Sequence, residues 1–261
     1  MKTKKILVYT IVASTIFGVS VYAGSKIKLV EPVKAESTNK AVSLEANAAA
    51  IKNISKINDK ILITNQTYSS LEGKISTTYH TTGEQEVIEL VIEQPGKFYA
   101  KQILDSKNPS YFVEAVNDGE EVQVKESDSS EVQTSLPPNK SDAKAIYETN
   151  NAITPDYNGT YLPIGGVNEL LHPEMFIQGA FTRGNVTVKG IEKYLERETT
   201  VVSLDYPKGK LGNKHTFSID NQTGIILKLV SSEDDKPIQT ITFEQIKFSD
   251  KIDGVKFKKF K

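Results

Sequence analysis

The residue types that most often carry chemistry are thinly spread in this chain. Its three histidines, His80, His172 and His215, lie far apart without a second ligand at metal-site spacing, and the chain has no cysteine. Transition-metal sites need such ligands close together. We therefore expect these histidines to be solvated or to lie on strand surfaces, and we expect no metal or other cofactor.

Paired carboxylates are the next candidates, because general acid and base catalysis requires at least one desolvated member of a pair. Each pair in this chain stands beside residues that favour turns, where water would solvate both groups. The pairs are Glu84 with Glu86, Glu120 with Glu121, and Asp234 with Asp235. The sequence therefore predicts that these carboxylates are solvated and not catalytic.

Two weaker signals also fall short of an active site. The Gly165-Gly166 pair precedes a predicted short helix and could hold an anion there, but no lysine-bearing phosphate loop surrounds it. No serine or threonine stands in a nucleophile elbow. We therefore predict a binding protein and not an enzyme.

Residues 1–35 are predicted to be an export segment. Three lysines at the start precede residues 6–24, which are apolar apart from small and hydroxyl residues. A signal peptide could be cleaved after Ala23 or after Ala35. The stretch is also close to the ~20 residues that cross a bilayer, so a retained anchor that associates the protein with the membrane is the alternative. In both cases the remaining chain is extracytoplasmic, either secreted or anchored to the cell membrane.

The remainder, residues 36–261, has the length of a single domain. Residues 1–35 hold six lysines and one glutamate, so the formal charge of −1 for the whole chain becomes −6 for the rest. Arg183 and Arg197 are the only arginines. An acidic, arginine-poor domain is poorly suited to phosphates and base edges, so we expect no nucleic-acid partner.

The first part of this domain predicts a helix followed by a sheet. Val42, Ala46 and Ala49 share one stripe of a helix within residues 36–60. From residue 71 the period changes to two, which predicts a strand over 71–80. Further strands are predicted at 86–93, 98–104, 111–116 and 121–126, joined by turns such as Asn117-Asp118-Gly119. Five strands with short turns predict an antiparallel meander.

The middle of the chain interrupts this pattern. Proline and serine residues break 127–165 into predicted loops with one short helix at 141–149. Residues 166–171 and 173–181 are predicted to form one or two further short helices. Strands are predicted again at 186–194, 199–206, 215–219, 225–231, 238–248 and 255–257. No helical period separates successive strands, so a parallel βαβ architecture is not expected.

Several predicted strands are apolar on both faces, as expected for a sheet that is covered on both sides or curled around a cavity. Candidate cavity-lining residues come from both halves of the sheet: Ile75, Leu90, Ile92, Val113, Val122, Val202, Leu204, Leu227, Leu229 and Phe243. A helical lid would present Leu170, Leu171, Met175, Phe176 and Phe181. A closed core and an acyl-sized pocket are both compatible with this pattern.

The order of these elements resembles the bacterial outer-membrane lipoprotein carrier superfamily of the LolA type, which includes the RseB-type envelope-stress regulators. The resemblance rests on residues 71–75, 94–100, 217–229, 240–248 and 255–257 and covers most of residues 55–258. It implies a mainly β (α+β) fold over residues 36–261: a strongly curved antiparallel half-barrel of about ten or eleven strands, with an N-terminal helix and a short helical lid.

The resemblance also implies a function. Its members use the concave apolar face to shield a lipid or lipoprotein acyl chain, so such a chain is the expected partner. This sequence departs from the Gram-negative carrier in its 127–165 insertion, and its composition resembles that of low-GC Gram-positive bacteria, which have no outer membrane. The alternative function is an envelope-stress or sporulation regulator that binds a membrane protein such as an anti-sigma factor.

Overall fold

The computed structural model of the 261-residue chain describes residues 60–61, 63–64, 67–94, 96–137, 162–173, 185–209, 212–252 and 254–260. The predicted export segment, the N-terminal helix up to residue 59 and the helix at 141–149 lie outside these residues. Within the described ranges, no helix has both the length and the apolarity needed to span a membrane.

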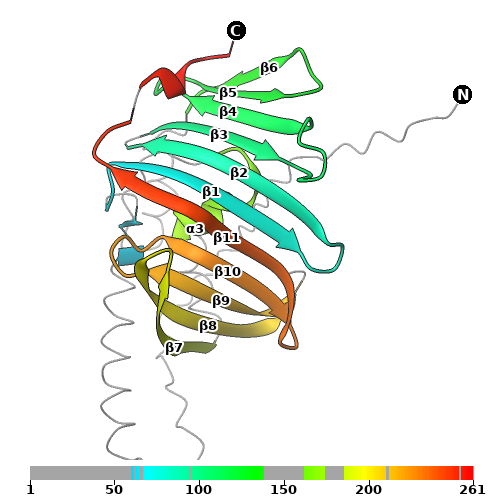
Figure 1. Ribbon diagram of the computed structural model, residues 1–261, viewed down its shortest axis with the longest axis vertical. Coiled ribbons are helices and arrows are strands. Elements are labelled where there is room, and N and C mark those ends of the chain that lie inside the picture. The colour runs from blue at the N-terminus through cyan, green and yellow to red at the C-terminus, as the bar shows by residue number, and fades with distance from the viewer. Residues whose placement is uncertain are drawn as a thin grey trace, which may run out of the picture. The chain divides into compact units, whose positions relative to one another are not determined.

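The described residues form one open antiparallel sheet of eleven strands (Figure 1). A first meander comprises β1 (Ser70–Tyr79), β2 (Glu84–Glu93), β3 (Lys97–Ile103), β4 (Phe112–Asn117), β5 (Val122–Glu126) and β6 (Val132–Ser135). A second comprises β7 (Asn185–Tyr194), β8 (Arg197–Gly209), β9 (Gly212–Asp220), β10 (Ile226–Glu233) and β11 (Lys236–Ser249). The two meanders join where β1 pairs with β11. The predicted mainly β half-barrel is thereby confirmed.

Two local predictions were wrong. Val132–Ser135 lies in the stretch predicted to be loops, yet it forms β6 by pairing with β5. This strand has only four residues and no buried side chain, so its own sequence carries no alternation of apolar and polar residues. It is a strand because it pairs with β5. Gly254–Phe257 forms a 3-10 turn, η3, where a last strand was predicted.

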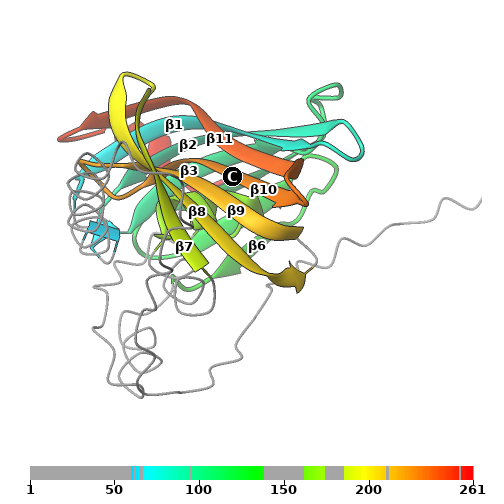
Figure 2. The same cartoon turned by 90° about the horizontal axis from the view of Figure 1, so that it is seen from below.

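The sheet curves around one apolar face. Leu71, Ile75 and their cross-strand neighbours point to this concave side, because side chains alternate along each strand. The register of β1 against β11 shifts between Lys74 and Ile75, and such bulges bend a strand and increase its twist. Figure 2 shows the sheet arched over the short helix α3 (Asn168–Leu171).

The convex face of β2 and β3 is covered by the end of the chain. Ile252 and Phe257 form a small buried cluster with Val91, and Tyr99 packs against it. Lys259 forms ion pairs with nearby carboxylates: Asp118 at 3.3 Å and Glu121 at 3.2 Å. The apolarity of β2 on both faces therefore arises because both faces are covered.

The turn between β9 and β10 fits closely against the residues that precede β1. Gly224 has a φ of +82°, and its N–H donates to the Asp220 carbonyl oxygen at 2.9 Å. A Cβ at this position would lie 2.7 Å from the Lys60 carbonyl oxygen. Only glycine satisfies both the backbone conformation and the contact.

We expect Gly224→Ala to lower the free energy of unfolding by about 2–4 kcal/mol, because it adds a backbone clash to left-handed strain. Gly83→Ala is the matched control: Gly83 has a φ of +73° but no atom within 4 Å of its Cβ position. It should cost only about 1 kcal/mol. Urea unfolding followed by circular dichroism measures both, and equal losses would contradict the close fit at Gly224.

Candidate binding site

The residues predicted to line a cavity lie together on the concave face. Nine of them belong to one buried hydrophobic cluster, and Val113 packs against it; the nine are Ile75, Leu90, Ile92, Val122, Val202, Leu204, Leu227, Leu229 and Phe243. Ile92 and Phe243 are fully buried, and Ile75 lies opposite Phe243 across the junction of the two meanders. Both halves of the chain therefore contribute to one apolar surface.

Residues 162–173, here called the cover segment, lie against this surface. They contain the 3-10 turn η2 (Gly165–Val167) and α3. The predicted lid residues Leu170 and Leu171 are both fully buried in the same cluster as the sheet residues, together with Leu162 and Val167. The other predicted lid residues, Met175, Phe176 and Phe181, lie outside the described residues.

The cover segment is folded by its own hydrogen bonds. The Leu162 N–H donates to Asn168 Oδ1 at 3.0 Å, and Asn168 Nδ2 donates to the Leu162 carbonyl oxygen at 2.8 Å. The His172 N–H donates to the Asn168 carbonyl oxygen at 2.7 Å. Because these bonds close within the segment, its leucine side chains can pack on the sheet as one unit.

A polar group interrupts the concave face near the start of β2. The Glu86 carboxylate accepts hydrogen bonds from Gln102 Nε2 at 2.9 Å and from the Tyr79 hydroxyl at 3.3 Å. Burial raises the pKa of Glu86, and burial together with the Glu86 charge raises the pKa of Tyr79 to about 12. Gln102 also lies directly against Gly165 of the cover segment.

The sequence-based expectation of a solvated Glu86 was therefore wrong. The alternation of side chains along β2 could have predicted this burial, because Glu86 is in phase with Ile88 and Leu90, which face the core. Asp234 and Asp235 do occupy a turn, as expected: both have positive φ, as in a two-residue hairpin connection between β10 and β11.

The three histidines differ in how far they are exposed. His80 is exposed, as expected, and its Nε2 lies 2.9 Å from the Thr240 hydroxyl. His172 is fully buried, so the expectation was wrong for this residue. His215 lies on β9 and is half-buried, with its Nδ1 3.0 Å from the Ser231 hydroxyl. Among the described residues, no three histidine, aspartate or glutamate side chains gather in a way that could hold a metal ion.

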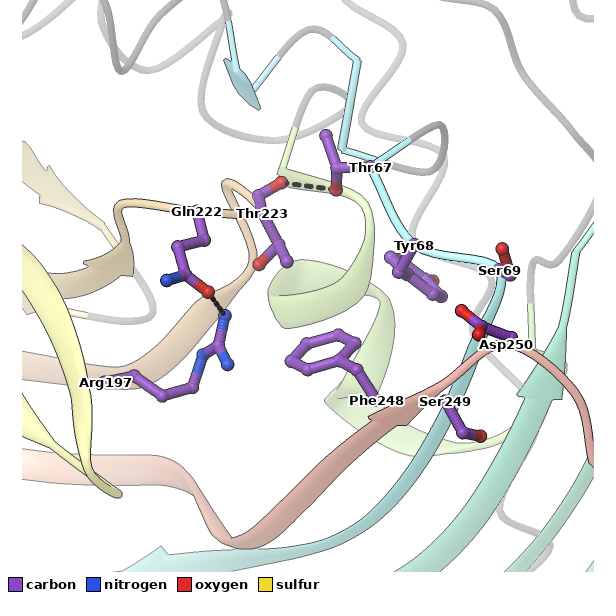
Figure 3. Close-up of a pocket in the computed structure, with 9 residues that line it drawn as sticks. All are labelled: Thr67, Tyr68, Ser69, Arg197, Gln222, Thr223, Phe248, Ser249 and Asp250. Carbon is purple, nitrogen blue, oxygen red and sulfur yellow. Dashed lines mark hydrogen bonds between the residues drawn. The ribbon is translucent and has the colours of Figure 1, made fainter.

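A second feature is a polar pocket of ≈ 410 Å³ at one end of the sheet (Figure 3). Four parts of the chain meet there: the residues before β1, the start of β8, the β9–β10 turn and the end of β11. The pocket is lined by Thr67, Tyr68, Ser69, Arg197, Gln222, Thr223, Phe248, Ser249 and Asp250. Sequence reasoning missed it because these residues are separated along the chain.

A buried ion pair organises this pocket. Arg197 donates from Nε and Nη2 to the two carboxylate oxygens of Asp220, at 3.0 and 2.8 Å. The Asp220 side chain is fully buried and also accepts from the Thr223 N–H at 2.9 Å and the Thr223 hydroxyl at 2.5 Å. The Arg197 guanidinium carbon lies 4.7 Å from the centre of the Phe248 ring. The arginine is thus fixed in place and its charge is compensated.

No family model and no curated protein matches the chain. Among solved structures it is similar to the MucA/MucB complex of Pseudomonas aeruginosa (11% identity, TM-score 0.38), covering 73% of this chain and 55% of that chain. It is also similar to the Mycobacterium tuberculosis lipoprotein LppX (11%, TM-score 0.40; 76% and 94%) and to an uncharacterized conserved protein from Thermus thermophilus (8%, TM-score 0.43; 82% and 94%).

The chain spans a little over half the length of the MucB chain. At these identities and TM-scores the similarity assigns this chain no ligand and no partner, so its own residues must carry any functional conclusion.

Acid should destabilise the protein through His215, because burial lowers the pKa of this side chain to about 4 from an ordinary 6.5. The neutral imidazole favours the folded state above pH 6.5, and this contribution is lost as the pH falls from 6.5 towards 4. The loss is up to about 3 kcal/mol, at 1.36 kcal/mol per pKa unit. We expect His215→Asn to lose less stability than the parent between pH 7 and pH 4 in urea unfolding. If the free energy of unfolding of His215→Asn fell between pH 7 and pH 4 by as much as that of the parent, the attribution of this loss to His215 would be contradicted.

Removing Arg197 should leave the buried Asp220 carboxylate without its counter-charge. We expect Arg197→Met to lower the free energy of unfolding by about 2–4 kcal/mol. Lys193→Met, which removes the exposed ion pair with Glu196, should cost less than about 0.5 kcal/mol. Adding Asp220→Asn to Arg197→Met should recover part of the loss. If Arg197→Met and Lys193→Met lowered the free energy of unfolding equally, the Arg197–Asp220 pair would stabilise the fold no more than an exposed ion pair does.

Proposed function

We propose that this protein is an exported, non-catalytic binding protein that holds a lipid or lipoprotein acyl chain on the concave face of its half-barrel. The observation that carries the proposal is the gathering of apolar residues from both meanders under a separately folded cover segment. An acyl chain makes only apolar contacts and needs no hydrogen bonds, so such a face suits it.

The energetics allow exchange between the cover segment and a ligand. Each buried CH₂ group contributes about 0.8 kcal/mol, so twelve methylenes contribute roughly 10 kcal/mol. Docking of Leu162, Val167, Leu170 and Leu171 contributes about 1.5–3 kcal/mol for each side chain, or roughly 6–12 kcal/mol. Because the two terms are similar, the cover segment could yield to an acyl chain and return when the chain leaves.

The proposed site consists of the ten sheet residues and of a lid that includes Leu170 and Leu171, with Met175, Phe176 and Phe181 as further members. The protein would act outside the cytoplasm, with residues 6–24 either removed with the signal peptide or kept as a membrane anchor. No cofactor and no nucleic acid enters the proposed function.

A second candidate function is regulation through a membrane protein such as an anti-sigma factor. The observation that favours it is the edge strand β7, which within the described residues pairs with β8 alone and leaves Ile191 55% exposed. A partner segment could add a strand to such an edge. Pull-down of one membrane protein, lost in Ile191→Asp but retained in Leu170→Ala, would support this function.

The acyl-binding function is tested on the protein as recovered from an exporting host. Organic extraction followed by mass spectrometry should release a lipid, and a fluorescent fatty acid should bind to the delipidated protein with saturation. A protein that carries no lipid and binds no fatty acid would contradict the proposal.

We expect Leu170→Ala to raise the affinity for the fluorescent fatty acid by about tenfold or more. The substitution removes about 2–5 kcal/mol of core packing, which favours the undocked cover segment and increases the binding-competent fraction. Ile252→Ala is the matched control, since Ile252 is also buried, with 5% exposure against 0% for Leu170, but lies in the convex cluster. It should lower stability without changing affinity, and equal affinity changes in both variants would contradict the role of the cover segment.

A further inference from the structure

The floor of the polar pocket is continuous with the concave face. The Tyr68 and Phe248 rings pack at 5.7 Å between centroids and 59° between planes. Tyr68 is a member of the main hydrophobic cluster, and Phe248 packs against it. Phe248 lies opposite Leu71, which is fully buried in the same cluster. An acyl chain on the concave face could therefore end beneath this aromatic pair, with its polar end in the pocket.

The charges of the pocket disfavour an anionic group. Among the described residues that line it, Arg197 is the only cation, and Asp220 compensates its charge by accepting two hydrogen bonds. Asp250, which is exposed, adds a carboxylate to the lining. Among the described residues that line this space, a phosphate would meet the Asp250 carboxylate and no cation other than the paired Arg197.

The remaining polar atoms suit hydroxyl groups. In Figure 3, Arg197 and Thr223 lie on one side of the pocket and Asp250 on the other, with the Phe248 ring between them. The Thr223 hydroxyl donates to Asp220 and accepts from the Ile225 N–H at 3.3 Å, which leaves it one lone pair, and the Asp250 carboxylate also accepts. Arg197 Nε and Nη2 are engaged by Asp220 and Gln222, while Nη1 makes no hydrogen bond within the described residues and can donate. Donors and acceptors in one pocket match a group that has both.

We infer that this pocket takes the uncharged, hydroxylated head group, such as a glycerol or sugar unit, of an acylated ligand whose chain lies on the concave face. The inference rests on the proposed acyl-binding function and adds the chemical class of the head group. Arg197 and Asp220 would act as a fixed frame for this group, because their mutual pairing prevents either from moving to a new partner.

The test uses the full chain as recovered from the exporting host, delipidated, with displacement of the fluorescent fatty acid as the readout. Three ligands share one acyl chain: a monoacylglycerol, the methyl ester, and the monoacylglycerol phosphate. We expect the monoacylglycerol to displace the probe at a concentration about tenfold below that of each of the other two, which corresponds to one or two hydrogen bonds.

Substitutions in the pocket separate the head group from the chain. Asp250→Asn should narrow the preference of the protein for the monoacylglycerol over its phosphate, because it removes the negative charge. Gln222→Ala should reduce the preference over the methyl ester to within about threefold, because it frees Arg197 from one of its anchors. Gln245→Ala, on an exposed part of β11, is the control and should retain both preferences.

Each outcome decides between the two proposals. Equal displacement by the three ligands would overturn the head-group inference and leave acyl binding supported. No displacement by any of them would overturn the acyl-binding function itself. Free glycerol or glucose is tested separately by thermal shift; stabilisation at concentrations that match the monoacylglycerol would show a site for free polyols and overturn the link to an acyl chain.

Discussion

The antiparallel pairing of β1 with β11 is the interaction on which the rest of the structure depends. It joins strands from opposite ends of the described chain, with register from Ser70↔Ser249 to Tyr79↔Gln239. Closing so long a loop costs conformational entropy, which burial at the junction must offset. Gly73 contributes to this junction, because a Cβ there would lie 2.8 Å from the Phe243 ring. Without the pairing, each meander would expose half of the apolar concave face.

The same pairing explains why the cover segment lies where it does. The cover segment belongs to the connection between β6, at one outer edge of the sheet, and β7, at the other, and its described residues lie on the concave face. A segment with apolar side chains can bury them there, and the Asn168 hydrogen bonds satisfy its backbone at Leu162 without help from the sheet. The protein therefore supplies its own occupant for a surface that a ligand could also occupy.

The polar pocket follows from the same convergence of elements. Tyr68 precedes β1 and Phe248 ends β11, so their rings meet because these two strands are neighbours. Arg197 and Asp220 then place a compensated ion pair beside an aromatic wall that belongs to the core. An apolar face that ends at such a pocket has the polarity pattern of an amphiphile, with a long apolar part and a short polar one.

The sequence by itself determined the strands and the residues that face inward, because an alternation of apolar and polar side chains has only one arrangement that buries the apolar set. It therefore predicted nearly every strand and the ten concave-face residues. Only the tertiary structure decided which groups become neighbours across the sheet. β6 depends on β5, the environment of Glu86 depends on Gln102 and Tyr79, and the pocket depends on four segments that meet at one end. These features depend on distances between residues remote in the chain, which a local period of two does not encode.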